Sequence, residues 1–185
     1  MVQAYKRQSY SLLEAKSGHY ILDVGCGTGD DVLALAKIVR ANGRAVGIDN
    51  SEVMITEAKK KGERLNSASE FYTTNGQQFD FNEGSFDGCR ADRVFQHLSD
   101  RKQVLSEMIR VVRPGGRIVV SDPDYDTSII DLPDNKLTRR ILAFSSDLIR
   151  NGWSGRQLYR LFKELGLIDI IVFPVTLGIH RFCSS

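Results

Sequence analysis

Glycines and carboxylates gathered between residues 23 and 31 are the side chains best placed to bind a ligand. Glycines alternate with other residues at Gly25, Gly27 and Gly29, and this G-x-G-x-G spacing differs from the G-x-G-x-x-G of dinucleotide-binding proteins. Glycines at such a turn let the backbone approach a ligand closely at the start of a helix. The spacing predicts a ligand-binding loop, although an ordinary tight turn could have the same composition.

The charges around this loop indicate which end of a ligand it faces. Asp23 precedes the glycines, and Asp30 and Asp31 follow them. Three carboxylates would repel a pyrophosphate and attract an amino-acid ammonium group. The two acids after the loop also suit the positive end of a helix dipole without any ligand. The charge pattern favours a ligand with a cationic end over one with phosphates.

Two polar segments further along the chain predict the rest of this site. Asp49 follows the apolar residues 46–48, and in doubly wound folds an acid at this place accepts hydrogen bonds from ribose hydroxyls. Helix capping is the alternative role for Asp49, but Asn50 or Ser51 could fill that role as well. Residues 74–77 (Thr-Asn-Gly-Gln) could meet an adenine edge, although Asn-Gly is by itself a strong turn signal.

Alternating strand-like and helix-like segments must hold these residues in place. Short apolar runs predict strands at residues 20–24, 44–48, 70–73, 85–91, 117–121 and 168–177. Helical spacing of apolar residues predicts helices at 30–41, from a cap at residue 50 or 51 to Gly62, at 100–112, at 133–151 and at 155–165 after a Ser154 cap. This alternation predicts a doubly wound, Rossmann-like α/β fold with a mostly parallel sheet and helices on both faces.

Composition excludes several classes of protein. At 185 residues the chain has the size of one domain, and a hydrophobic fraction of 42% can supply a core. The formal net charge of +2 gives no electrostatic reason to expect a nucleic-acid partner. No apolar run approaches the roughly 20 residues that span a bilayer. The three cysteines form no metal or redox motif, so we expect reduced thiols in a cytoplasmic protein.

Five motifs in order resemble the class I S-adenosylmethionine-dependent methyltransferases, especially the group related to ubiquinone and menaquinone biosynthesis. The motifs are Ile-Leu-Asp-Val-Gly-Cys-Gly-Thr-Gly at 21–29, Val-Gly-Ile-Asp at 46–49, Gly-Ser-Phe-Asp at 84–87, Gln-His-Leu at 96–98 and Val-Arg-Pro-Gly-Gly at 112–116. The resemblance covers about residues 20–175, and we expect one methyltransferase domain over residues 1–185 with a helical insertion at about residues 127–152. This fold often builds a lid over the methyl acceptor at the segment that corresponds to residues 133–153, so we expect substrate choice to be set there.

The resemblance also implies a set of residues that bind S-adenosylmethionine. The set is Asp23, Gly25, Cys26, Gly27, Gly29, Asp49, Asn50, Met54, Asn75, Gly76, Gln77, Arg90 and Ala91. By resemblance, the loop glycines line the methionine part, Asp49 holds the ribose, and the backbone near Arg90 and Ala91 contacts the amino group. Asn75 and Gly76 would face adenine, with an amide at Asn75 where the family usually has Asp. An internal ion pair is the alternative role for Arg90.

One departure from the family concerns the end of the sheet. The family's sheet closes with an antiparallel strand between the fifth and sixth strands, and the residues after 177 are too few to form it. We therefore expect this strand to be missing. The sheet could then have a gap, its sixth strand could shift inward, or another chain could complete the edge, as in a homodimer.

The predicted activity is methyl transfer from S-adenosylmethionine to a small-molecule acceptor by in-line displacement. His97 is the first candidate for a general base, with packing or capping as its alternative role. The acidic residues 122–126 could orient a hydroxyl acceptor, bind a metal or form a solvated loop, and no metal site is predicted. A cofactor-binding protein without catalysis and an NAD-dependent oxidoreductase are the competing functions; the loop spacing and its charges disfavour the oxidoreductase.

Overall fold

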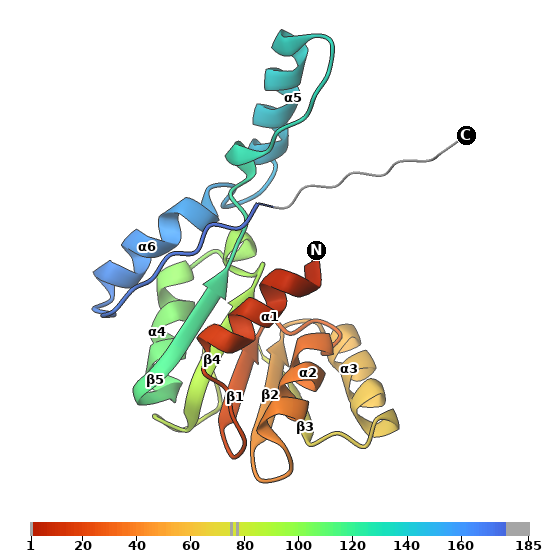
Figure 1. The fold of residues 1–185 in the computed structure, drawn as a ribbon, viewed down its shortest axis with the longest axis vertical. Helices are drawn as coiled ribbons and strands as arrows, with labels where there is room; N and C mark the ends of the chain where they lie inside the picture. Colours follow the sequence, from red (N-terminus) through yellow and green to blue (C-terminus); the bar gives the residue numbers. More distant parts are fainter. Residues whose placement is uncertain (1, 75, 77, 177–185) are drawn as a thin grey trace.

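The predicted doubly wound fold is confirmed by the computed structural model, which describes residues 2–74, 76 and 78–176. Its elements are α1 (Val2–Leu12), β1 (Tyr20–Val24), α2 (Asp30–Val39), β2 (Arg44–Asp49), α3 (Glu52–Arg64), β3 (Ser69–Thr73), β4 (Phe86–Asp92), the 3-10 turn η1 (Phe95–His97), α4 (Arg101–Val111), β5 (Val112–Ser121), the 3-10 turn η2 (Tyr125–Thr127), α5 (Asn135–Asp147) and α6 (Ser154–Glu164). The strands form one parallel sheet in the order β3-β2-β1-β4-β5 (Figure 1).

Two apolar layers cover the two faces of the sheet. Successive side chains of a strand point to opposite faces, so Ile21 of β1 packs with α2 and α3, and Leu22 packs with α4 and α6. Tyr10 and Leu13, at the end of α1 and just after it, belong to the first layer. Because all the strands are parallel, the carboxyl ends of β1, β2 and β4 meet at one edge, where ligands bind in such folds.

Most element boundaries agree with the sequence patterns, and the exceptions have local causes. Trp153 is the N-cap of α6 in place of the predicted Ser154, whose hydroxyl instead donates to the Asp122 carboxylate at 2.5 Å. The prediction that Gly62 ends its helix is wrong, because α3 continues to Arg64. β5 begins at Val112, before the predicted start at residue 117. Val112 already pairs with Phe86 of β4, and residues 113–116 bulge out of the ladder before pairing resumes at Arg117.

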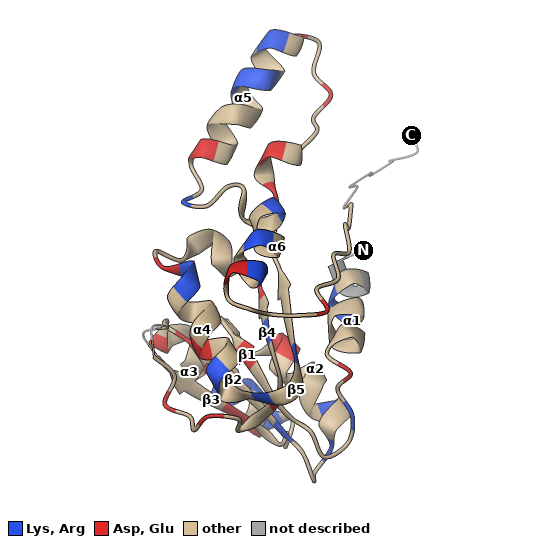
Figure 2. Cartoon of the chain, turned by 90° about the vertical axis from the view of Figure 1, so that its left-hand side faces the viewer, with Lys and Arg blue, Asp and Glu red and all other residues tan. Residues whose placement is uncertain are grey.

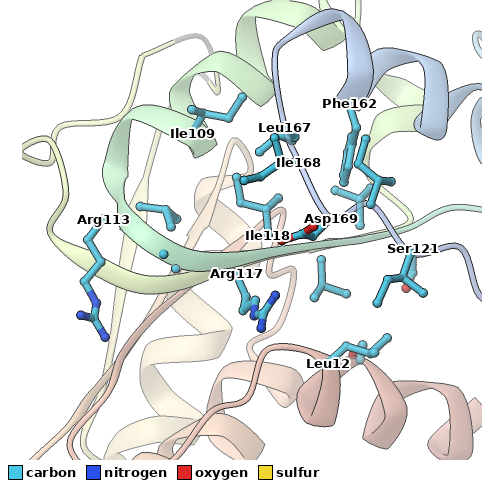
Figure 3. Close-up of a pocket in the computed structure, with 18 of the residues that line it drawn as sticks. Leu12, Ile109, Arg113, Arg117, Ile118, Ser121, Phe162, Leu167, Ile168 and Asp169 are labelled. Atoms are coloured by element: carbon cyan, nitrogen blue, oxygen red, sulfur yellow. The ribbon is translucent and has the colours of Figure 1, made fainter.

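The predicted sixth strand is wrong for residues 168–176, which have no strand structure; residue 177 lies outside the described residues. A strand needs a partner for its backbone groups, and this segment does not pair with β5. A groove of about 770 Å³ lies between them, lined by Leu12, Ile118, Phe162 and Leu167 among others (Figure 3). Within the described ranges, β5 is therefore an unpaired edge.

Helix α5 extends away from the sheet (Figures 1 and 2). Three large apolar side chains of α5 and that of its C-cap residue follow at helical spacing and are between 39% and 67% exposed: Leu137, Ile141, Phe144 and the C-cap Leu148. Its buried positions include Thr138 and Ser146, which are polar. The exposed side of α5 is thus more apolar than the solvent-facing side of a surface helix usually is. Of the helices in the described part of the chain, none has the length and apolar character needed to cross a bilayer.

Candidate cofactor site

The glycine loop, residues 25–29, connects the end of β1 to the start of α2. Gly25, Gly27 and Gly29 have φ values of 68°, 54° and 80°, in the left-handed region that other residues avoid. The backbone N–H groups of Gly25 and Cys26 both donate to the carbonyl oxygen of Ile48, at 2.8 and 3.0 Å. These bonds fix the loop against the end of β2.

The three loop glycines have different surroundings. A Cβ on Gly25 would lie 2.4 Å from Val94 Cγ2, and a Cβ on Gly29 would lie 2.6 Å from Phe71 Cε1. A Cβ on Gly27 would meet nothing within 4 Å. The ends of the loop are therefore packed against the protein, and its centre is open to a ligand.

Asp49 links the end of β2 to the open centre of the loop. Its Oδ2 accepts a hydrogen bond from the Gly27 N–H at 2.9 Å, and its Oδ1 accepts one from the Ser51 N–H at 2.9 Å. Ser51, and not Asp49, is the N-cap of α3, as its Oγ accepts from the Met54 N–H. A carboxylate has about four acceptor positions, so Asp49 retains capacity for ribose hydroxyls.

Other predicted residues lie along the same edge. Met54 and Thr28 line a groove of about 480 Å³ between the loop and α3. Asn50 is exposed next to Asp49, and Gly76 has a φ of 74° with open space at its Cβ position. Asn75 and Gln77 lie outside the described residues, so the predicted adenine end is described only at Gly76. The larger groove beside β5 is lined by none of the described cofactor candidates.

Cys26 packs the loop onto β2 through its side chain. A Cβ on Gly47 would lie 2.7 Å from Cys26 Sγ, so Gly47 provides the space for this thiol. Burial is the main cause that raises the pKa of Cys26 above its ordinary value, and the nearby Asp23 and Asp49 add to the increase. The role of Gly47 has no distinctive sequence signal, because a glycine inside a strand pattern only indicates a close approach.

The carboxylates around the loop each have a cationic partner in the structure, so they are not the free charges that the sequence suggested. Asp23 Oδ1 lies 3.0 Å from Arg90 Nη1, and Asp30 Oδ1 lies 3.0 Å from Lys61 Nζ. Asp31 Oδ2 lies 2.7 Å from Lys6 Nζ. Burial raises the pKa of Asp23, and Arg90 opposes this shift. The sequence revealed these acids but not the cations that neutralise them.

Arg90 and Ala91 are both buried in the sheet next to the end of β1. Ala91 is in register with Val24 on one side and Val120 on the other. The Arg90 side chain forms the internal ion pair with Asp23 that was the alternative to a cofactor role. A contact between the cofactor amino group and the backbone here stays a prediction.

Of the polar groups that follow β4 and β5, Asp122 has more unusual surroundings than His97. His97 is exposed at the end of η1, and its Nε2 lies 3.0 Å from Gln96 Nε2. Asp122 follows β5, and its Oδ1 is buried without a hydrogen-bond partner. Burial raises the pKa of Asp122 to about 6, although the Ser154 hydroxyl opposes the shift. The sequence shows the acidic segment 122–126 but has no signal that distinguishes Asp122 within it.

The other two acids of this segment anchor α6. Asp124 accepts a hydrogen bond from Arg156 Nη2 at 2.9 Å, and Asp126 accepts a weaker one from the same nitrogen at 3.4 Å. The structure thus gives Asp124 and Asp126 a role that the sequence did not suggest, ion pairs to a neighbouring helix.

Comparison with known proteins agrees with this architecture. The model of a methyltransferase domain family matches residues 15–166. A Streptomyces fradiae protein of 37.1 kDa from a transposon is 41% identical over 94% of this chain, and the chain spans half of that protein's length. A demethylmenaquinone methyltransferase of Bacillus cereus is 34% identical over 96% of this chain and 81% of its own.

Solved structures share the fold at low sequence identity. An S-adenosylmethionine-dependent methyltransferase from Aquifex aeolicus has a TM-score of 0.69 at 20% identity, over 87% of this chain and 78% of its own. A methyltransferase-like protein from Bacillus halodurans has a TM-score of 0.70 at 19% identity, over 88% of this chain and 68% of its own. With a family match over most of its length, the chain belongs to the class I S-adenosylmethionine-dependent methyltransferases.

Proposed function

We propose that this methyltransferase transfers the methyl group of S-adenosylmethionine to a small-molecule acceptor by in-line displacement. The observation that carries the proposal is the bridge from Asp49 to the open glycine Gly27 at the carboxyl edge of the sheet. A carboxylate there would provide hydrogen-bond acceptors for ribose hydroxyls. The open space at Gly27 would let the methionine part of the cofactor approach the loop backbone closely.

The residues at this edge fit the cofactor. Gly25, Gly27 and Gly29 would line its methionine part, Asp49 would hold the ribose, and Met54 would lie beside the adenosine along α3. When bound, S-adenosylmethionine would supply an activated methyl group: the acceptor nucleophile would bond to the methyl carbon as the carbon–sulfur bond breaks, and S-adenosylhomocysteine would leave. The chain must then mainly hold the acceptor in position and exclude water.

A general base is required only for acceptors that lose a proton. Asp122 is a second candidate for this role beside His97, because it follows β5 at the same edge of the sheet and burial raises its pKa. Asp122 also lies near the backbone of Val94, whose side chain packs against Gly25 of the loop. A carboxylate with a pKa of about 6 is ionised at neutral pH and can accept a proton there.

The acceptor would bind to the helical insertion at residues 127–152. The exposed apolar side chains of α5 and its C-cap, Leu137, Ile141, Phe144 and Leu148, give that insertion a surface suited to an apolar molecule. The Bacillus relatives are named demethylmenaquinone methyltransferases, and a quinol-type ring is an acceptor of this kind. The acceptor part of the proposal rests on this surface and on that name.

Calorimetry and a transfer assay test the proposal together. We expect S-adenosylhomocysteine to bind the full chain and NADH not to bind. Radiolabelled S-adenosylmethionine should then label a quinol or phenol more than an amine. Binding of S-adenosylhomocysteine without transfer to any of the three would favour a cofactor-binding protein, and NADH binding in its place would refute the assignment.

The homodimer remains a prediction of its own. The unpaired edge of β5 would be its contact. Light scattering over a range of concentrations tests it, and a monomer throughout would contradict it.

A further inference from the structure

A largely buried group of charged and aromatic side chains, with Asp23 and Arg90 fully buried at its centre, lies beside the glycine loop and joins four elements of the fold. We call it the Arg90 cluster; it consists of Tyr5, Lys6, Tyr10, Asp23, Asp31, Arg90 and Asp92. Arg90 is 1% exposed, and its Nη1 lies 3.0 Å from Asp23 Oδ1 and 3.1 Å from Asp31 Oδ2. Its Nη2 lies 3.5 Å from Asp92 Oδ2.

Helix α1 supplies the remaining members of the cluster. Lys6 Nζ lies 2.7 Å from Asp31 Oδ2 and 3.7 Å from Asp92 Oδ2. The Tyr10 hydroxyl donates to Asp31 Oδ1, and the Arg90 guanidinium lies 5.4 Å from the centre of the Tyr10 ring. Asp31 therefore receives both of its α1 contacts from two residues one helical turn apart.

The charges of the cluster come closer to balance when α1 is in place, because Lys6 adds a second cation. Asp23, Asp31 and Asp92 provide three carboxylates, and Arg90 and Lys6 provide two cations. Without Lys6, one buried guanidinium would face three carboxylates. Uncompensated charge away from water is costly, so removal of Lys6 should loosen the segment that carries Asp31.

The cluster holds both ends of the glycine loop. Asp23 stands two residues before Gly25, and Asp31 stands two residues after Gly29. Arg90 contacts both acids through one nitrogen, so it fixes the separation between the two ends of the loop. Any shift of Asp31 therefore changes the shape of the loop that faces the cofactor.

The family match begins at residue 15, so α1 (Val2–Leu12) lies outside it. We propose that Lys6 and Tyr10 are positioning residues of the cofactor site: their contacts with Asp31 hold the glycine loop in its binding conformation although neither residue belongs to the loop. This inference rests on the cofactor part of the proposed function and is independent of the acceptor.

Calorimetry with S-adenosylhomocysteine on the full chain tests the inference. We expect Lys6→Met to weaken binding about tenfold and Tyr10→Phe about threefold to tenfold, because each removes a bond to a charged group. Lys6→Arg should restore affinity to within about threefold, since it keeps a cation near Asp31. Arg7→Met is the matched control: Arg7 lies exposed on the same helix, and we expect no more than about a twofold change.

Hydrogen exchange provides the second measurement. In Lys6→Met the amides of residues 25–33 should exchange faster, while those of β3 should not change. Unchanged affinity in both Lys6→Met and Tyr10→Phe would overturn the proposal, and so would an equal loss in Arg7→Met. If Lys6→Met fails to fold, the milder Tyr10→Phe decides the question. Wild-type binding without methyl transfer would count against the acceptor proposal and leave this one standing.

Discussion

Asp49→Asn tests the cofactor site most directly, because the substitution preserves shape and changes only the acceptor capacity. Both Asp49 oxygens accept backbone N–H groups at 2.9 Å, from Gly27 and Ser51. Asparagine has one acceptor oxygen, so one of these N–H groups would face an NH₂ group. A hydrogen bond to a charged group contributes about 1.5–3 kcal/mol. The free energy of unfolding should fall by about this amount.

Two measurements on Asp49→Asn separate a structural role from a binding role. For a chain of this size, about 1 kcal/mol corresponds to about 2–4 °C, so Tm should fall by about 3–12 °C. The lost acceptor for the ribose should also weaken S-adenosylhomocysteine binding about 10- to 150-fold in calorimetry. Asp131→Asn, at an exposed loop position, is the control for both. A lower Tm with unchanged affinity would refute the ribose role and leave Asp49 as a clamp on the loop.

Three further substitutions test other parts of the structure. Gly29→Ala should lower Tm more than the control Gly166→Ala. The two glycines have nearly the same φ, 80° and 79°, but only at Gly29 would the new Cβ meet Phe71 and Ala58. Equal losses of Tm in thermal unfolding would contradict this packing. Asp122 has a pKa of about 6 in the folded chain and about 3.9 when unfolded. The folded state therefore binds more protons than the unfolded state between these two values, and the free energy of unfolding falls as pH rises from about 4 to 6. Asp122→Asn should flatten that part of the Tm-against-pH curve, and an unaltered curve would count against the buried carboxylate. Phe144→Ser should leave Tm within about 2 °C, because the side chain is 64% exposed, yet reduce transfer to an apolar acceptor; unaffected transfer would remove α5 from the acceptor site.

The sequence predicted the parts of the fold that depend on local periodicity and turns. The strand at residues 20–24 and the glycines after it are recognisable because an apolar run and positive-φ residues are consecutive in the chain. The same holds for Gly166, which follows α6 at a φ of 79°. Such features need no knowledge of distant contacts.

Features that depend on distant contacts were missed or misjudged. Lys6 and Lys61 lie 25 and 31 residues from the acids that they neutralise, so the loop carboxylates looked unpaired in the sequence. Residues 168–176 are apolar enough for a strand but pair with no neighbour in the structure. The family assignment does not depend on the loop charges, because five separate motifs support it.

The packing of Cys26 against Gly47 also bears on whether a bound methyl donor could methylate the enzyme itself. A thiolate is a strong nucleophile, and a methyl donor held by the loop would expose such a group to alkylation. Burial raises the pKa of this thiol further above neutral, and its sulfur packs toward Gly47 of β2. We therefore expect Cys26 to resist methylation by a bound donor.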